Sequence, residues 1–298
     1  MTTQPNLLVT GASGHLGQRV LHHLLDTLNI APDRIIATSR NTQGLAAFAA
    51  RGVTTRVADF SDAAALPAAF AGADRLLLIS TTSFEDRFTQ HKSAISAAIE
   101  AGVKHVIYTS IPNPADPTLA IVRDHAATEV ALAASSLPGW TVLRNNWYFE
   151  NLNWTIPSML KSGKWFTASG DGRIAYVSRD DLAYAAAAAL ANGGDAKSTL
   201  TLSGAKAYTT AELAELISAA SGKPLAAVQI SPADLERGMV GSGMPAPMAA
   251  VMTSAEINIA AGRLADVTGD VKALTGVEPL SFEDWLASTM PALLKAAA

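Results

Sequence analysis

Cysteine is absent from this 298-residue chain, so a disulfide framework, a thiolate nucleophile and a cysteine-ligated metal are all excluded. Charged residues are sparse, at 16% of the sequence, and the 22 Lys and Arg residues form no basic cluster beside 26 Asp and Glu. A nucleic-acid-binding surface normally carries such a cluster. We therefore expect no nucleic-acid partner.

Long hydrophobic runs are also missing. The longest apolar stretch, around Leu182 to Ala191, falls far short of the roughly 18 residues that favour a membrane span. The segment from Met1 to Asn6 is polar and leads straight into a strand-like run, which is not the pattern of a secretory signal. We expect a cytoplasmic protein with no membrane partner.

Motifs of metal sites and of common hydrolases are lacking as well. All 6 histidines precede residue 126 and none has H-E-x-x-H spacing, so we expect no metal. No G-x-S-x-G sequence occurs, which argues against an α/β-hydrolase nucleophile. What the chain does have is 49% hydrophobic residues, enough for a large buried core.

Short apolar runs alternate with amphipathic segments along the first half of the chain. Strand-like runs occur at 7–10, 34–38, 54–58, 75–80, 105–110 and 141–144, and helix-like segments lie between them. Continuously apolar strands separated by helices are typical of a parallel sheet covered on both faces, and right-handed crossovers make it doubly wound. We predict an α/β fold with a Rossmann doubly wound parallel sheet.

Local signals in the second half predict turns and helix caps. The segment Gly170 to Gly172 is typical of a hairpin turn. Ser178, with Asp181 three residues later, is expected to cap a helix over 182–191. Thr210 is the expected cap of the next helix.

The regular pattern weakens after the sixth strand, which predicts two parts. We expect a nucleotide-binding Rossmann domain over 1–150, to which 175–203 returns. The segments 151–174 and 204–298 are expected to form a smaller C-terminal α/β substrate lobe.

A glycine-rich loop joins the first predicted strand to the first predicted helix. Gly11 allows a sharp turn, Gly14 lets a pyrophosphate approach the backbone, and Gly17 lets the helix pack closely on the sheet. The diphosphate then binds N–H groups at the helix start, where the helix dipole favours anions. This strand–loop–helix context favours a dinucleotide site over a structural turn. The candidate binding residues are Gly11, Ala12, Ser13, Gly14, His15, Leu16 and Gly17.

The end of the second strand indicates which dinucleotide binds. An NAD site usually has an acidic residue there, but this chain has Ser39 and Arg40. The planar guanidinium of Arg40 suits a 2′-phosphate, and Ser39 adds a hydroxyl. We predict NADP(H), with a solvated surface charge as the alternative interpretation of Arg40.

Further cofactor contacts are expected at the ends of the third and fourth strands. Asp59, next to Phe60, can accept from an adenine amino group, or it can cap a helix instead. Ile79, Ser80 and Thr81 end the fourth strand, where parallel sheets form their ligand crevice, so we expect them beside the nicotinamide ribose.

These motifs together resemble the NmrA-like atypical short-chain dehydrogenase/reductases, and within them the bacterial type-2 NADPH:quinone oxidoreductases, with triphenylmethane reductases as near relatives. The resemblance covers most of the chain and is carried by residues 10–17, 39–41, 58–60, 77–80, 101–110, 125–129 and 143–151. It implies a Rossmann domain with a small substrate lobe. It also implies NADPH binding at the three glycines and Arg40, with contacts from Asp59, the 79–81 segment and the 108–110 strand end, including Ser110.

The chain departs from ordinary short-chain reductases because it lacks their Tyr-x-x-x-Lys pair. Ile121 stands about where the Tyr is expected, and His125 about where the Lys is expected. A simple ketone needs a positioned acid, because its reduction forms a strongly basic alkoxide. Hydride addition to a quinone gives a delocalised, phenolate-like anion that water can protonate. The missing pair therefore favours quinone-like acceptors.

His125 is the best polar candidate near the nicotinamide. It can bind the ribose or donate to the developing oxyanion, and the alternative is a partly buried structural histidine. Tyr108 is expected to pack in the sheet rather than react.

Aromatic and amide side chains after the sixth strand are the candidate acceptor pocket. Asn146, Trp147 and Tyr148 are the candidates, with Tyr148 as a second catalytic hydrogen-bond donor, and the alternative is ordinary packing between lobes. Phe84 is expected to cap the pocket.

The leading hypothesis is an NADPH-dependent reductase that transfers hydride to a quinone or similar electron-poor conjugated acceptor, without flavin. One alternative is an NADP(H)-sensing regulatory protein that binds a protein partner. Another is a reductase of triarylmethane dyes or activated carbonyls. We expect a monomer or homodimer.

Overall fold

The computed structural model describes residues 4–83, 85–114 and 122–297, and the chain folds as two compact units. The first unit comprises Met1–Ile111, Asp124–Asn145 and Leu182–Thr201. The second unit comprises Pro112–Arg123, Asn146–Asp181 and Leu202–Ala298.

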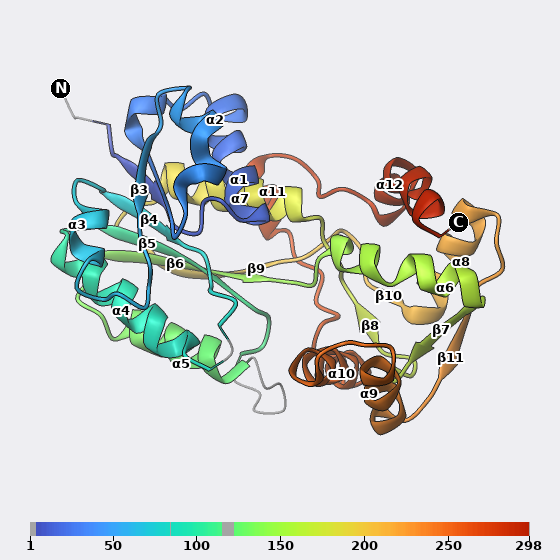
Figure 1. Cartoon of the computed structure of the whole chain (residues 1–298). Helices are drawn as coiled ribbons and strands as arrows, with labels where there is room; N and C mark the ends of the chain where they lie inside the picture. The colour runs from blue at the N-terminus through green and yellow to red at the C-terminus, as the bar shows by residue number, and fades with distance from the viewer. Residues whose placement is uncertain (1–3, 84, 115–121, 298) are drawn as a thin grey trace. The chain divides into compact units, whose positions relative to one another are not determined.

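A seven-stranded sheet forms the centre of the first unit (Figure 1), with the strand order β3-β2-β1-β4-β5-β6-β9. The pairs from β3 through β6 are all parallel. This order is that of a doubly wound dinucleotide-binding sheet, so the predicted α/β fold is confirmed. The strands are β1 (Leu7–Val9), β2 (Ile35–Ser39), β3 (Thr54–Val57), β4 (Arg75–Leu78), β5 (His105–Ser110), β6 (Gly139–Asn145) and β9 (Lys197–Leu202).

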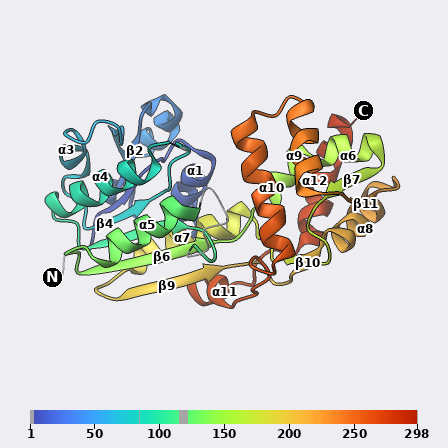
Figure 2. The same cartoon turned by 90° about the horizontal axis from the view of Figure 1, so that it is seen from below.

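Helices cover both faces of this sheet, with α1, α2 and α7 on one face and α3, α4 and α5 on the other (Figures 1 and 2). The α-helices are α1 (His15–His22), α2 (Ala46–Ala49), α3 (Leu66–Phe70), α4 (Arg87–Glu100), α5 (Val122–Ala133) and α7 (Arg179–Asn192). A π-helical turn, His23–Thr27, continues α1, and 3-10 turns occur at Pro32–Arg34 and Thr42–Leu45.

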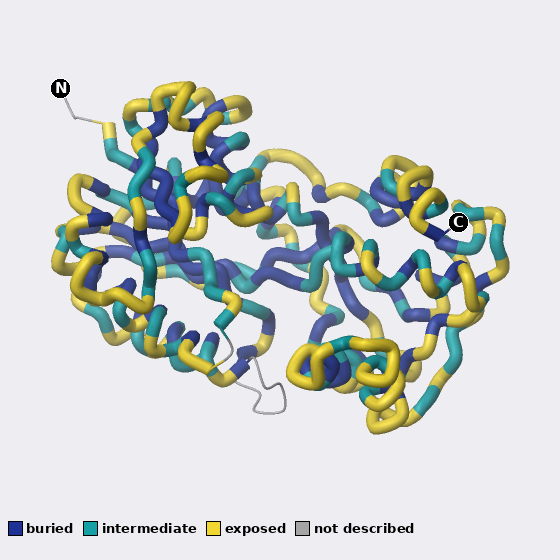
Figure 3. The backbone as a smooth tube through the Cα atoms, in the orientation of Figure 1, coloured by how far each residue is buried: buried dark blue, intermediate teal, exposed yellow. Residues whose placement is uncertain are grey.

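The central strands of this sheet are buried because helices exclude water from both faces, whereas the edge strands β3 and β9 are largely exposed or half-buried. All residues of β1, β2 and β5 are buried, as the continuously apolar runs predict (Figure 3). Leu8, Leu76, Val106 and Phe70 belong to a core that packs α3 and α4 against one face. This packing fixes the strand ends from which the candidate site is built.

The second unit is irregular and contains two small sheets. Strand β8 (Arg173–Ile174) pairs antiparallel with β10 (Tyr208–Thr209), and β7 (Lys164–Thr167) pairs in parallel with β11 (Ala226–Gln229). Its helices are the 3-10 turn Phe149–Trp154, α6 (Ile156–Ser162), α8 (Thr210–Ser221), α9 (Pro232–Gly241), α10 (Ala246–Ala260), α11 (Asp270–Thr275) and α12 (Phe282–Ala296). Helices α9 and α10 lie side by side (Figure 2).

Two local predictions in the second half need correction. Gly172 does close a turn on Ser169, but the flanking strands pair with other strands, so the predicted hairpin is wrong. A Cβ at Gly172 would lie 2.1 Å from the Ile259 carbonyl, so the glycine serves close packing on α10. The cap of α8 is Thr209 rather than Thr210.

The cap at Ser178 is confirmed, because the Asp181 amide donates to its hydroxyl at 2.9 Å. The units also differ in their bounds from the expected domains. Residues 146–150 lie in the second unit, and only 182–201 of the segment expected to return lies in the first. The function of each unit stays a prediction. Within the described residues, no helix combines the length and the apolar character that crossing a membrane requires.

Candidate functional site

The loop between β1 and α1 is a tight turn held by backbone hydrogen bonds. Gly11 has φ +58°, a conformation that a residue with a Cβ rarely adopts. The Ala12 amide donates to the Thr38 carbonyl of β2, and the Gly14 amide donates to the Gly11 carbonyl, both at 3.0 Å. The chain therefore turns sharply off the strand, as predicted for Gly11.

Helix α1 starts in close contact with this turn. A Cβ on Gly17 would lie 2.5 Å from the Gly11 carbonyl oxygen and 2.7 Å from Ala12 Cα, so only glycine fits there. Gly14 is the N-cap, and no side chain caps the helix start. The first helical amides consequently point at the place where an anion is favoured, which suits a dinucleotide diphosphate.

The residues that open α1 have different surroundings. His15 is exposed, whereas Leu16 is buried in the core and offers a ligand only its backbone. The predicted contacts of both with a cofactor stay predictions.

The end of β2 brings two hydroxyls together beside an exposed cation. Ser13 Oγ and Ser39 Oγ are 2.6 Å apart, which joins the glycine loop to the second strand. Arg40 follows and is exposed, and no ion pair of Arg40 occurs within the described part of the chain. This arrangement fits a 2′-phosphate, whose oxygens accept hydrogen bonds from hydroxyls and guanidinium groups.

Two threonines hold the end of β4. Thr10 Oγ1 donates to the Leu77 carbonyl at 2.9 Å and accepts from the Ile79 amide at 3.0 Å. The Ser80 amide donates to Thr109 Oγ1 at 2.9 Å. The backbone of the 79–81 segment is thus held beside the glycine loop, and Ile79 Cβ lies 3.7 Å from where a Gly11 Cβ would be.

The Asp59 carboxylate has a hydrogen-bond partner close by in the chain. Its Oδ1 accepts from the Ser61 amide at 2.9 Å, which orders the turn after β3. Phe60 packs against the core of the first unit. Asp59 does not cap the next helix, α3, whose N-cap is Ala65 and which has no side-chain cap, so the capping interpretation is wrong. Adenine binding by Asp59 stays a prediction.

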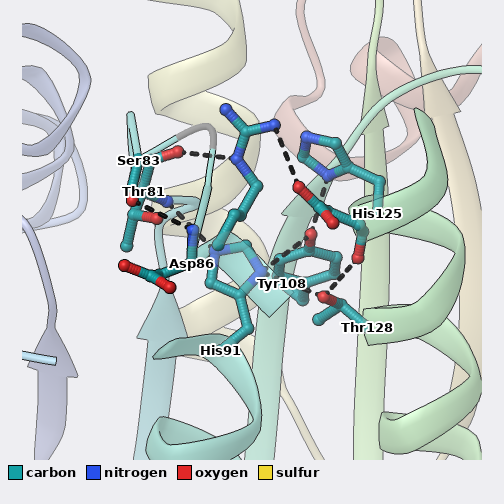
Figure 4. Close-up of polar contacts among 9 residues, drawn as sticks. Thr81, Ser83, Asp86, His91, Tyr108, His125 and Thr128 are labelled. Atoms are coloured by element: carbon teal, nitrogen blue, oxygen red, sulfur yellow. Dashed lines mark hydrogen bonds and ion pairs between the residues drawn. The ribbon is translucent and has the colours of Figure 1, made fainter. Parts of the chain in front are cut away.

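A buried polar cluster lies beyond the ends of β4 and β5 (Figure 4). The Tyr108 hydroxyl is 2.7 Å from His125 Nδ1 and 3.4 Å from His91 Nδ1. His91 Nδ1 is 3.0 Å from Thr128 Oγ1, and its Nε2 accepts from the Thr81 amide at 3.1 Å. Tyr108, His91 and Thr128 are fully buried, and His125 is 2% exposed.

Burial, together with a neighbouring guanidinium, sets the charge state of this cluster. Arg87 donates through Nε to the Thr81 carbonyl at 2.9 Å and lies 3.9 Å from the Asp124 carboxylate. Burial, with the Arg87 charge as a second cause, lowers the pKa of both His91 and His125 to about 3. Both imidazoles are therefore neutral near pH 7.

Ser110, a predicted cofactor contact, is bound by a neighbouring ion pair. Its hydroxyl donates to Glu129 Oε1 at 2.6 Å, and the Arg144 guanidinium donates to both oxygens of that carboxylate at 3.1 and 2.7 Å. The hydroxyl thus has a structural partner already, and its contact with a cofactor stays a prediction.

The candidate pocket residues lie in the second unit. Both polar ends of the Asn146 amide are used there, because it donates to the Leu264 carbonyl at 3.1 Å and accepts from the Trp147 amide at 2.8 Å. Trp147 packs against the core of that unit, and the Arg179 guanidinium lies 5.4 Å from the Tyr148 ring centroid. Phe84 lies outside the described residues.

The partners of His125 are not among the predicted site contacts. Tyr108 is expected to pack in the sheet, with the 108–110 strand end as an implied cofactor contact; it is buried, and its hydroxyl also reaches His125. His91 is not among the predicted site residues. The available signal was a histidine early in each of the helices after β4 and β5, with a tyrosine in the strand between them. Among the described residues, no group of three or more His, Cys, Asp or Glu side chains is placed to hold a metal.

A model of the NmrA-like family matches residues 3–282, so the chain belongs to the NmrA-like family. Quinone oxidoreductase 2 of Escherichia coli K12 is 36% identical over 270 residues, which cover 91% of this chain and 93% of that protein. NAD(P)H azoreductase of Xenophilus azovorans is 28% identical over 280 residues, which cover 94% of this chain and 96% of that protein.

Solved structures give the same picture. The E. coli NADPH-dependent quinone oxidoreductase QOR2, crystallised with NADPH, has a TM-score of 0.89 and 34% identity, covering 96% of this chain and 99% of that one. The Citrobacter triphenylmethane reductase with NADP(H) has a TM-score of 0.87 and 31% identity, covering 98% and 99%. The predicted family and its likeness to these two reductases are confirmed. The relatives also agree with the predicted NAD(P)H-dependent oxidoreductase and with NADP(H) as its cofactor.

Proposed function

We propose that this chain is an NADPH-dependent reductase that transfers hydride to a quinone or a similar electron-poor conjugated acceptor, without flavin and without a Tyr-x-x-x-Lys pair. The proposal includes action in the cytoplasm as a monomer or homodimer. It also assigns cofactor binding to the first unit and acceptor binding to the second.

The observation that carries the proposal is the uncapped start of α1 behind a loop in which only glycine fits. Gly17 brings the helix to backbone distance from Gly11 and Ala12, so the loop amides form a compact cradle. A diphosphate there gains both hydrogen bonds and the helix dipole. The hydroxyls of Ser13 and Ser39 and the exposed Arg40 then hold the 2′-phosphate.

The chain's own residues have the role of positioning the nicotinamide and the acceptor. When bound, the nicotinamide supplies a hydride to the acceptor. The backbone at Ile79, Ser80 and Thr81 lines the nicotinamide-ribose side, and His125 donates a hydrogen bond to the oxygen that gains charge. Trp147 and Tyr148 are assigned to the acceptor pocket. A delocalised quinone anion needs no stronger acid, which is consistent with the missing Tyr and Lys.

NADPH oxidation followed at 340 nm with a panel of benzoquinones tests the proposal. We expect saturable turnover with quinones, at least tenfold more efficient with NADPH than with NADH, without added flavin; that factor is about what one charge-assisted contact supplies. Turnover that appears only after flavin is added would contradict direct hydride transfer.

The same assay separates the alternatives. Because the Citrobacter enzyme that resembles this chain is a triphenylmethane reductase, triarylmethane dyes and activated carbonyls are assayed beside the quinones. Turnover confined to dyes changes the acceptor but keeps the enzyme class. No turnover with any acceptor, together with tight discrimination between NADP⁺ and NADPH in binding, would favour a regulatory sensor. The negative transcriptional regulator NmrA in complex with NAD is 15% identical with a TM-score of 0.77, which shows the fold alone.

A further inference from the structure

The buried cluster around Tyr108 fixes where the protons of two histidines lie. Tyr108 is on β5, His91 on α4, and His125 and Thr128 are on α5 (Figure 4). All four side chains are nearly or completely buried, so the polar atoms that face one another must pair among themselves rather than with water. The hydrogen bonds among them therefore determine which nitrogen of each histidine carries the proton.

The two ring nitrogens of His91 have different hydrogen-bond partners. Its Nε2 accepts the Thr81 amide proton at 3.1 Å, so this nitrogen carries no proton in the neutral ring. The proton lies on Nδ1, 3.0 Å from Thr128 Oγ1. That oxygen is free to accept, because its own hydrogen is donated to the Asp124 carbonyl at 2.6 Å.

The Tyr108 hydroxyl lies within hydrogen-bond distance of both His91 and His125. Because His91 Nδ1 carries a proton, the Tyr108 oxygen can only accept from it, across 3.4 Å. Thr128 also contacts the Tyr108 hydroxyl, but its Oγ1 already accepts from His91, so we assign the Tyr108 proton to His125 Nδ1, at 2.7 Å. A neutral His125 with an accepting Nδ1 has its proton on Nε2.

His125 Nε2 is the end of this chain of hydrogen bonds. Within the described residues it has no hydrogen-bond partner, and Figure 4 shows it on the side of the ring away from Tyr108. We propose that Tyr108, with His91 behind it, is a positioning residue that holds His125 in the Nε2–H form, so that His125 donates a hydrogen bond to the acceptor oxygen as it gains charge. This proposal rests on the proposed reductase function.

The charges around the cluster define what His125 contributes. Arg87 faces both imidazoles, His91 faces His125, and Asp124 is the carboxylate paired with Arg87. Burial also raises the pKa of the Tyr108 hydroxyl, so it keeps its proton. A neutral imidazole is a good hydrogen-bond donor and a poor acid. The acceptor therefore takes two electrons and one hydrogen as hydride, and its oxyanion takes the second proton from water.

Long-range ¹H–¹⁵N correlation spectra of the full chain labelled with ¹⁵N-histidine test the assignment directly. We expect His125 to be neutral with its proton on Nε2, and His91 to be neutral with its proton on Nδ1, from pH 8 down to about 5. His125→Gln and His91→Gln assign the two signals. A protonated Nδ1 on His125, or a cationic ring at pH 6, would overturn the proposal whatever the kinetics of the variants show.

Kinetics of Tyr108→Phe test the consequence. The substitution keeps the ring and removes only the hydroxyl, so the His125 tautomers should mix and kcat with benzoquinone should fall about tenfold. The KM for NADPH should stay within about twofold, since the cradle is untouched. Tyr184→Phe is the matched control, because Tyr184 is in the same unit and stacks on another histidine, His23, with ring centroids 4.8 Å apart. It should keep full activity.

The outcomes separate this proposal from the proposed function. A wild-type chain without quinone turnover contradicts the function, while the spectra still decide the tautomer. Wild-type turnover with an unchanged kcat in Tyr108→Phe overturns the positioning role. A raised KM for NADPH with unchanged kcat would place His125 on the ribose and overturn the proposed contact with the acceptor.

Discussion

The two units bury polar side chains in different ways. In the first unit, His91, Tyr108 and His125 form a chain of hydrogen bonds that ends at an imidazole nitrogen without a partner among the described residues. In the second unit, the half-buried Glu256 accepts from both the Thr167 hydroxyl and the Ala168 amide. The second cluster closes on itself, whereas the first leaves a donor unused.

The surrounding cores differ in the same sense. The second unit packs aromatic rings on one another, with Phe149 against Phe282 and Trp285 at centroid distances of 5.3 and 5.4 Å. The core between the sheet and helices α3 and α4 of the first unit is mainly aliphatic, with Phe70 and Tyr108 among its buried aromatic residues. A closed polar cluster stabilises a fold. An open one at the carboxyl end of a parallel sheet is placed for a ligand, which is consistent with the proposed hydrogen bond from His125 to the acceptor.

Among the substitutions that distinguish the two units, Gly17→Val should have the largest effect. The new side chain would meet backbone atoms of Gly11 and Ala12 at 2.5 to 2.7 Å, and backbone cannot move aside cheaply. We expect the free energy of unfolding to fall by about 3 kcal/mol or more, and NADPH binding to be lost. Urea unfolding and NADPH fluorescence titration measure both.

Gly238→Ala in α9 of the second unit is the matched control. A Cβ there would have no heavy atom within 4 Å. Replacing glycine inside a helix should raise stability by about 0.5–1 kcal/mol and leave NADPH binding unchanged. If Gly17→Val were equally harmless, the glycine loop would be no close-packed cradle.

Acid should act on the first unit through its buried imidazoles, above all those of His91 and His125. The pKa of both His91 and His125 is about 3 in the folded chain, against 6.5 for an ordinary histidine. The unfolded chain therefore binds more protons between those pH values, so stability is lost as pH falls through that window. From pH 6.5 to 5 we expect a loss of about 2 kcal/mol for each imidazole.

His125→Gln isolates one of these two protons. Urea unfolding of wild type and variant is compared at pH 8, where neither folded nor unfolded imidazoles are charged, and again at pH 5. The difference in unfolding free energy between wild type and variant should shrink by about 2 kcal/mol at the lower pH. A difference that stays constant would mean that His125 is already charged in the folded chain.

Arg40→Asp tests whether the end of β2 selects the cofactor. Losing a charge-assisted contact and adding a like charge should weaken NADPH binding by about 10- to 100-fold and leave NADH nearly unaffected. Arg237→Asp, an exposed arginine of the second unit, is the control and should change neither affinity. Equal weakening of both cofactors by Arg40→Asp would remove the 2′-phosphate from this site.

The sequence predicted the first unit well because its pattern is local. Continuous apolar runs such as Leu7–Val9 and Ile35–Ser39 are buried strands, and the glycine spacing defines the turn before α1. The second unit was predicted poorly. Its strands are short and pair across long stretches of chain, as Ala226–Gln229 does with Lys164–Thr167, and no local signal specifies that pairing.

The candidate site shows the same limit. The cradle residues are consecutive in the chain, so their motif is readable in one dimension. The chain of hydrogen bonds through His91, Tyr108 and His125 links a strand and two helices, and it depends on burial and on the orientation of the rings. Residue spacing records neither of these, which is why the hydrogen bond from Tyr108 to His125 is not predictable from the sequence.

The smallest expected effect concerns how each unit starts a helix. Helix α1 has no side-chain cap, whereas α8 has a capping box in which Thr209 Oγ1 accepts from the Glu212 amide at 3.1 Å and Glu212 Oε2 accepts from the Thr209 amide at 2.8 Å. Thr209→Ala should lower the free energy of unfolding by about 1 kcal/mol, and Thr209→Ser should lose only a few tenths, because serine keeps the acceptor. Neither variant should change the Kd for NADPH, since a filled helix start holds no ligand. The Kd for NADPH is measured beside urea unfolding. A shift in that Kd with Thr209→Ala would contradict the view that the capped helix α8 contributes to stability whereas the uncapped helix α1 binds the cofactor.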